Sequence, residues 1–106
     1  MPKWLFYKEL SAIEPLQLVA ATIGHKDVVF VREGDAVVCF LDQCTHQPLM
    51  LSEFGDFSEG KIRCHAHGAK FCGRFGEVLE GPAEDCLTRY QVKVEKGNVF
   101  VCLQDS

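Results

Sequence analysis

The amino-acid sequence predicts an all-β fold, with an antiparallel β-sandwich or small barrel as its base. Three observations support this class. β-Branched and aromatic residues gather in short runs, turn-forming residues separate these runs, and no segment shows a long run of helical periodicity. The chain has 106 residues without a break in composition, so one domain over residues 1–106 is expected.

The N-terminal part of the chain is expected to supply most of the base. Residues 28–31 are apolar and lie between the turn residues Gly24 and Gly34, which favours hairpins between neighbouring strands. The expected elements are an edge strand at residues 4–8, a loop or short helical turn at 11–15, and strands at 17–23, 27–32 and 36–42.

The C-terminal end is expected to complete the base with a hairpin. Tyr90, Val92 and Val94 alternate with polar residues, which is the period of a strand with one wet face. A turn at residues 96–98 then leads to an antiparallel strand at 99–103. The expected boundaries are about 1–41 and 88–106 for the base strands, and about 42–87 for a segment of two ligand-bearing loops between them.

Charge and composition exclude several classes of function. The net charge is −4 and no run of Lys and Arg occurs, so nucleic acid is not an expected partner. The start of the chain is not expected to be a signal peptide, because Lys8 and Glu9 close its short apolar stretch, and no apolar run is long enough for a bilayer. A cytoplasmic protein without a membrane partner is therefore expected. In that reducing compartment, the six cysteines are expected to include metal or cluster ligands rather than a disulfide framework.

Two Cys–His pairs in the middle segment are the candidate ligands. Cys44 and His46 form the first pair, Cys64 and His67 the second, and seventeen residues separate His46 from Cys64. Two thiolates on one iron and two neutral imidazoles on the other lower the negative charge of a two-iron, two-sulfur cluster, so the cluster is easier to reduce. Such centres have potentials of roughly −150 to +300 mV, against about −400 mV for all-cysteine plant-type clusters.

Two alternatives to this ligand set remain open. Two Cys and two His could hold a structural zinc ion, although zinc fingers usually place ligands of one kind together. His65 could compete with His67, although the C-x-x-H spacing favours His67. A brown colour, expected for an iron–sulfur protein, would separate the cluster from zinc.

The two pairs and the residues around them resemble the Rieske family. Leu51-Ser52-Glu53 follows the first pair, and His67-Gly68-Ala69 with Phe71 matches the second loop of the family. The similarity covers nearly the whole chain and is greatest to the stand-alone Rieske ferredoxins of bacterial aromatic-ring dioxygenase systems. Further matching positions are Gly76, Gly81-Pro82-Ala83, Leu87, Tyr90, Val92, Val94, Gly97 and Val99.

The resemblance implies one Rieske-type 2Fe-2S cluster, with Cys44 and Cys64 on the inner iron and His46 and His67 on the outer, solvent-facing iron. It implies a monomeric electron-carrier component of a multicomponent oxygenase system, not an enzyme. Single electrons would pass from a flavoprotein NAD(P)H-dependent ferredoxin reductase to a terminal ring-hydroxylating dioxygenase in aromatic hydrocarbon catabolism. Other interpretations of the same resemblance are a small Rieske subunit of a nitrite reductase-type enzyme and an iron–sulfur redox sensor.

The resemblance also implies a low potential for a Rieske centre. Ala69 stands where high-potential relatives tend to place a hydroxyl donor to a cluster sulfide, and neither loop carries an extra Cys for a disulfide between the loops. Cys39 and Cys102 are expected to be buried core thiols. The resemblance implies a third loop, the proline loop with Gly81-Pro82-Ala83, that covers the cluster, and Cys72 and Cys86 flank the second loop and this third loop. Partner contacts are expected around the cluster tip, at Gln47, Pro48, Leu49, Gly68 and Pro82.

Overall fold

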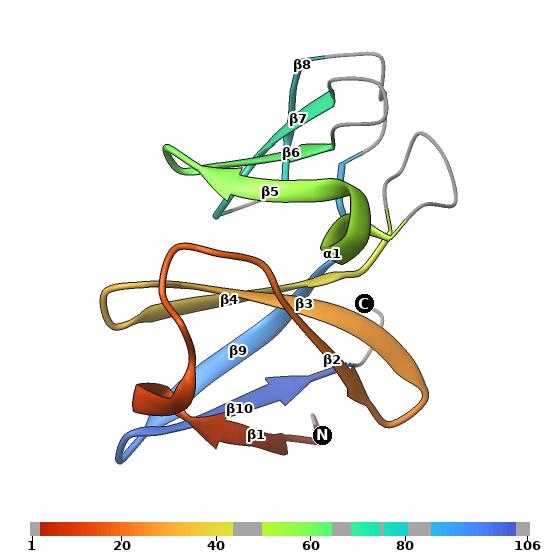
Figure 1. Cartoon of the computed structure of the whole chain (residues 1–106). Coiled ribbons are helices and arrows are strands. Elements are labelled where there is room, and N and C mark those ends of the chain that lie inside the picture. The colour runs from red at the N-terminus through yellow and green to blue at the C-terminus, as the bar shows by residue number, and fades with distance from the viewer. Residues whose placement is uncertain (1–2, 44–49, 65–68, 75, 81–85, 104–106) are drawn as a thin grey trace.

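The structure is a computed structural model of the chain (Figure 1), and it describes residues 3–43, 50–64, 69–74, 76–80 and 86–103. The longest helix in these ranges has four residues, so no helix there could span a bilayer. The elements in chain order are β1 (Leu5–Glu9), the 3₁₀ turn η1 (Leu10–Ala12), β2 (Val19–Ile23), β3 (Lys26–Glu33), β4 (Ala36–Leu41), α1 (Leu51–Phe54), β5 (Gly55–Ser58), β6 (Lys61–Cys64), β7 (Ala69–Cys72), β8 (Val78–Glu80), β9 (Arg89–Glu95) and β10 (Asn98–Cys102).

The larger sheet has six antiparallel strands in the order β1-β10-β9-β4-β3-β2. All strands predicted for the base are confirmed, and β1 lies at an edge as expected. The hairpins β2–β3, β3–β4 and β9–β10 are antiparallel, as the turn residues predicted. The start of β2 differs, because the strand begins at Val19 rather than at residue 17. Leu16 has a left-handed backbone, with φ 60, and this conformation interrupts an extended chain.

The larger sheet curls until its first strand faces its fifth. Three strands separate β1 from β3 in the sheet order, yet the Tyr7 ring of β1 stacks on the Phe30 ring of β3, with centroids 3.8 Å apart and planes 4° apart. The base is therefore closer to the predicted barrel than to two separate layers. The core that it encloses also contains Val28, Cys39, Tyr90 and Val101.

A second antiparallel sheet, in the order β5-β6-β7-β8, lies over the larger one (Figure 1). The sequence did not predict these strands or α1, because each has only three or four residues, too few to show a period. Glu59 and Gly60 connect β5 to β6, with φ 53 and 75. A two-residue turn with both φ angles positive matches the right-handed twist of paired strands.

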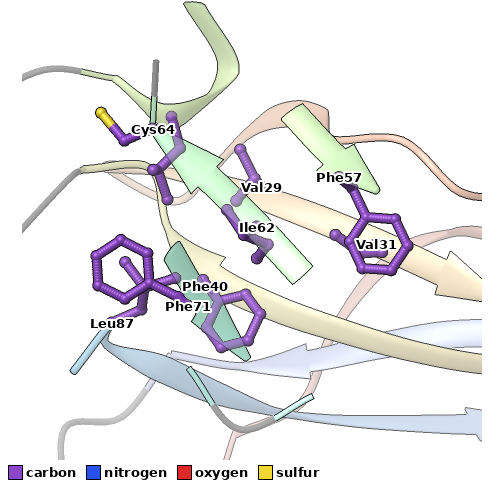
Figure 2. Close-up of a cluster of buried hydrophobic side chains, with 9 residues drawn as sticks. Val29, Val31, Phe40, Phe57, Ile62, Cys64, Phe71 and Leu87 are labelled. Carbon is purple, nitrogen blue, oxygen red and sulfur yellow. The ribbon is translucent and has the colours of Figure 1, made fainter. Parts of the chain in front are cut away.

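The two sheets pack through a shared apolar core, which we call the intersheet core (Figure 2). In β3, Val28 and Phe30 face the inside of the curled sheet, whereas Val29 and Val31 face the smaller sheet. Burial on both faces explains why residues 28–31 are all apolar. The intersheet core consists of Val29, Val31, Phe40, Leu51, Phe57, Ile62, Cys64, Phe71 and Leu87.

Candidate functional site

Cys64 is the one predicted ligand that lies within the described residues, and Cys44, His46 and His67 fall outside them. Cys64 ends β6 and is 1% exposed. Figure 2 shows it at one end of the intersheet core, with its sulfur turned away from the rings of Phe40 and Phe71. The backbone on either side of the two ligand loops therefore gives the geometry of the site.

The second ligand loop is the turn of the β6–β7 hairpin. Cys64 and Ala69 are Cα partners in this hairpin, so only residues 65–68 connect them, and His67 is two residues from Ala69 along the chain. Ile62 and Phe71 are also partners, and both are 0% exposed. Because a slip of one residue would turn both side chains out of the core, they fix the register of the hairpin. The fold thus places the Cys64 thiol at one end of the four-residue connection to which the predicted ligand His67 belongs.

The two ends of the first ligand loop are joined by hydrogen bonds to Asp42. The backbone N–H of Ser52 donates to Oδ1 of Asp42 at 2.8 Å, and the Ser52 hydroxyl donates to Oδ2 at 2.6 Å. The N–H of Asp42 donates to the carbonyl of Asp27 at 2.9 Å. We call these bonds between Asp42 and Ser52 the loop clamp. Asp42 is only 5% exposed, so its carboxylate needs such donors to offset the loss of water.

The bases of the two ligand loops meet at Gly55, the first residue of β5 and the Cα partner of Cys64. A Cβ on Gly55 would lie 2.7 Å from the carbonyl oxygen of Arg63 and 2.9 Å from that of Leu51. Only glycine allows the backbone before Cys64 to approach the backbone after the first loop so closely. Both loops therefore start from one small area of the fold.

A third loop is held to the same core through Gly76, which the sequence singled out. Its N–H donates to the carbonyl of Cys72 at 2.9 Å, and its carbonyl accepts from the N–H of Leu87 at 2.8 Å. With φ +76, and with Phe40 Cε1 only 2.9 Å from where a Cβ would lie, this position requires glycine. The contacts fix both ends of the segment that was predicted to cover the cluster, and residues 81–83 of that segment lie outside the described residues.

The thiols predicted as core residues are confirmed away from this site. Cys39 and Cys102 are 0% and 3% exposed. Burial raises the pKa of the Cys39 thiol to about 12, which disfavours the thiolate that a metal ligand requires. Cys72 is half-buried and Cys86 is exposed, and these two do not form a disulfide with each other.

The surroundings of Cys64 fit a two-iron, two-sulfur cluster, for which Cys44, His46 and His67 remain the predicted further ligands. Cys64 stands at the edge of an apolar core, which would exclude water from one side of a cluster, and Gly55 brings the two ligand loops to one place. Two thiolates and two imidazoles are the donor set of a Rieske centre.

Sequence reasoning missed the loop clamp and the role of Gly55. In the sequence, the loop clamp is marked only by Asp42, a carboxylate at the end of an apolar strand, and the contact of the two loops only by Gly55, a glycine between the two ligand pairs.

Comparison with known proteins agrees with this fit. The Rieske [2Fe-2S] domain family matches residues 3–91. The ferredoxin subunit of 3-phenylpropionate/cinnamic acid dioxygenase from Escherichia coli (strain K12) is 37% identical over 79 residues, which is 74% of each chain. Human apoptosis-inducing factor 3 is 32% identical over 89 residues, 84% of this chain but 14% of that protein.

Solved structures give the same result. The ferredoxin of carbazole 1,9a-dioxygenase from Nocardioides aromaticivorans IC177 has a TM-score of 0.85 and 26% identity, covering 93% of this chain and 96% of that one. A ferredoxin complex with the oxygenase of carbazole 1,9a-dioxygenase contains a chain with a TM-score of 0.81 and 28% identity, over 92% and 99% of the two chains.

The resemblance and the fold class found in the sequence are thus confirmed, as are the 2Fe-2S cofactor and the prediction of an electron carrier rather than an enzyme. The family match spans most of the chain, and the ferredoxin relatives share both its fold and its length. The chain belongs to the Rieske [2Fe-2S] domain family.

Proposed function

We propose that this chain is the ferredoxin of an aromatic-ring-hydroxylating dioxygenase system. It takes single electrons from a flavin-dependent NAD(P)H reductase and gives them to a terminal oxygenase. It acts as a cytoplasmic monomer and one Rieske domain, with base strands at about 1–41 and 88–106 and a cluster-binding segment at about 42–87. The dioxygenase named for the E. coli relative and the oxygenase complex among the structural neighbours support the choice of acceptor.

The proposed ligands are Cys44 and Cys64 for the inner iron, and His46 and His67 for the outer iron. The observation that carries this assignment is the buried position of Cys64 at the end of β6, beside the base of the first loop. When bound, the cluster supplies one-electron reduction and oxidation. The rest of the chain supports it by excluding water through the intersheet core and by holding the ends of the loops.

The proposed partner contacts are small and transient, because a carrier must leave its donor before it reaches its acceptor. They involve residues near the imidazole ligands, where an electron would leave the protein. The proposed contact residues are Gln47, Pro48, Leu49, Gly68 and Pro82, all outside the described residues.

Electron paramagnetic resonance of the dithionite-reduced protein tests the cluster and its ligands. A Rieske centre gives a low average g value, and the signal should be absent in His46→Ala and His67→Ala. It should persist in His65→Ala and in His25→Ala, since His25 lies exposed in the β2–β3 turn. Loss of the signal in His65→Ala with retention in His67→Ala would reverse the choice between these two residues. Bound zinc without acid-labile sulfide would contradict the cluster.

Reconstitution tests the proposed partners. The purified chain, mixed with a dioxygenase reductase and a terminal oxygenase, should restore NAD(P)H-dependent ring hydroxylation that the other two components cannot perform alone. Stable co-purification with a large nitrite reductase-type enzyme would favour a permanent subunit instead. A redox titration should give a midpoint near the lower end of the Rieske range, roughly −150 mV, and a clearly positive value would contradict that part of the proposal.

A further inference from the structure

The loop clamp holds a carboxylate beside the proposed cluster with no described cation to neutralise it. Within the described residues, the donors to the Asp42 side chain are the backbone N–H and the hydroxyl of Ser52, at 2.8 and 2.6 Å. Both donors are neutral, so they satisfy the oxygen atoms without cancelling the charge. Asp42 is 5% exposed, and water and salt therefore screen this charge less than they screen a surface carboxylate.

Asp42 is also close to the cluster because of its place in the chain. It lies two residues before Cys44, and the Cα atoms of residues two apart cannot be more than about 7.6 Å apart. A fixed negative charge at such short range opposes the addition of an electron. Reduction adds one negative charge to the cluster, so the carboxylate favours the oxidised state.

We propose that Asp42 has two separable roles at the cluster. Through Ser52 it closes the first ligand loop and slows the loss of the cluster, and through its charge it lowers the reduction potential. Asp42 is thus a positioning residue and a determinant of potential. The inference rests on the proposed function, because it requires a cluster bound by Cys44.

Two substitutions separate the roles. Asp42→Asn removes the charge, yet its amide oxygen can still accept from the N–H of Ser52 and its NH₂ group can donate to the Ser52 hydroxyl. Ser52→Ala keeps the charge and the backbone hydrogen bond but removes the hydroxyl donor. Ser52→Thr keeps both bonds and serves as the conservative rescue. Asp35→Asn, in the exposed turn between β3 and β4, removes one charge at the opposite end of β4 from Asp42.

The experiment uses the cluster-loaded protein and two readouts. The first is the ratio of reduced to oxidised cluster at one fixed ambient potential, and the second is the rate at which cluster absorbance is lost in the presence of an iron chelator. In Asp42→Asn the ratio should rise at least threefold, or about 28 mV at 59 mV per tenfold change, while the rate stays within twofold of wild type. In Ser52→Ala the rate should increase at least threefold and the ratio should not rise. Ser52→Thr and Asp35→Asn should match wild type in both readouts.

The outcomes distinguish this inference from the proposed function. A wild-type protein without acid-labile sulfide overturns both. A loaded wild type with a change of less than twofold in the Asp42→Asn ratio overturns the charge role alone. Equal rates of cluster loss in Ser52→Ala and Ser52→Thr overturn the role of the clamp. Failure of Asp42→Asn to hold the cluster shows that the two roles cannot be separated, and this result also rejects the proposal.

Discussion

Replacement of Gly55 by alanine should loosen both ligand loops at once. Gly55 has φ −128 and ψ 174, an extended backbone that alanine adopts without strain, so the effect must come from contacts. The new Cβ would lie 2.7 Å from the Arg63 carbonyl oxygen and 2.9 Å from the Leu51 carbonyl oxygen. Both neighbours are backbone atoms, which cannot rotate away as a side chain can. The two chain segments would have to separate by a few tenths of an ångström or more.

The expected cost follows from two opposing terms. Overpacking at a closely packed position costs about 1–3 kcal/mol. The change from glycine to alanine also restricts the unfolded chain, which offsets roughly 0.4–1 kcal/mol of that loss. The net loss in the free energy of unfolding should therefore be about 1 kcal/mol, and at most about 2.6 kcal/mol. For a domain of this size, each 1 kcal/mol lowers the melting temperature by roughly 4–8 °C.

The assay is thermal unfolding followed by circular dichroism at one scan rate, together with the rate of cluster loss to a chelator. Gly60→Ala is the matched control, since it lies at the opposite end of the β5–β6 hairpin with no atom within 4 Å of its Cβ position and with φ +75. The control should lose about 1–2 kcal/mol through the left-handed backbone, without faster loss of the cluster. Wild-type stability and wild-type cluster retention in Gly55→Ala would refute the reasoning.

Three further outcomes follow from the packing. Phe71→Ala removes a ring that is 0% exposed and should lose about 3–5 kcal/mol in denaturant unfolding, whereas Phe6→Ala, at 57% exposed, should lose less than about 1 kcal/mol. The pKa of Cys39 is raised from 9.0 to about 12, so its contribution to stability is complete below pH 9 and is lost between pH 9 and 12. The free energy of unfolding should fall in that range by up to about 1.4 kcal/mol per pH unit. Cys39→Ala should have a shallower pH slope, and equal slopes in the two proteins would show that Cys39 is not the cause of the fall. Cys64 stands at the end of β6, whereas Cys39 lies inside β4 with its thiol pKa raised to about 12, so after removal of the cluster a thiol reagent should label Cys64 faster than Cys39. Equally slow labelling of the two thiols, measured by mass spectrometry of the labelled peptides, would contradict this prediction.

The base was predictable because its strands are long enough to carry a pattern. Tyr90, Val92 and Val94 show the alternation of a strand with one buried face, and β9 contains all three. Gly24 and Gly34 mark hairpin turns, and both have positive φ. The sequence left a sandwich and a small barrel open, because the curl brings together residues that are far apart along the chain, such as Tyr7 and Phe30.

The candidate site was predictable in its ligands but not in its support. The spacing of the Cys–His pairs is local, so the sequence displays it directly. The loop clamp joins Asp42 to Ser52 across a ten-residue interval, and no periodicity marks such a pair. The position of Gly55 depends on two backbone segments that meet only in the folded chain. Strands β5 to β8 escaped prediction because three or four residues are too few to define an alternation.

The chain enters and leaves the smaller sheet at neighbouring points, because the N–H of Leu41 donates to the carbonyl of Thr88 at 2.9 Å. A segment whose ends nearly touch can be transplanted between homologues as a cassette, since the acceptor scaffold needs no rearrangement to receive it. The main constraint on such a chimera is the surface beneath the cassette, where Val29, Val31 and Phe40 are buried. A donor segment with a complementary apolar underside would bring its own redox properties to an unchanged scaffold.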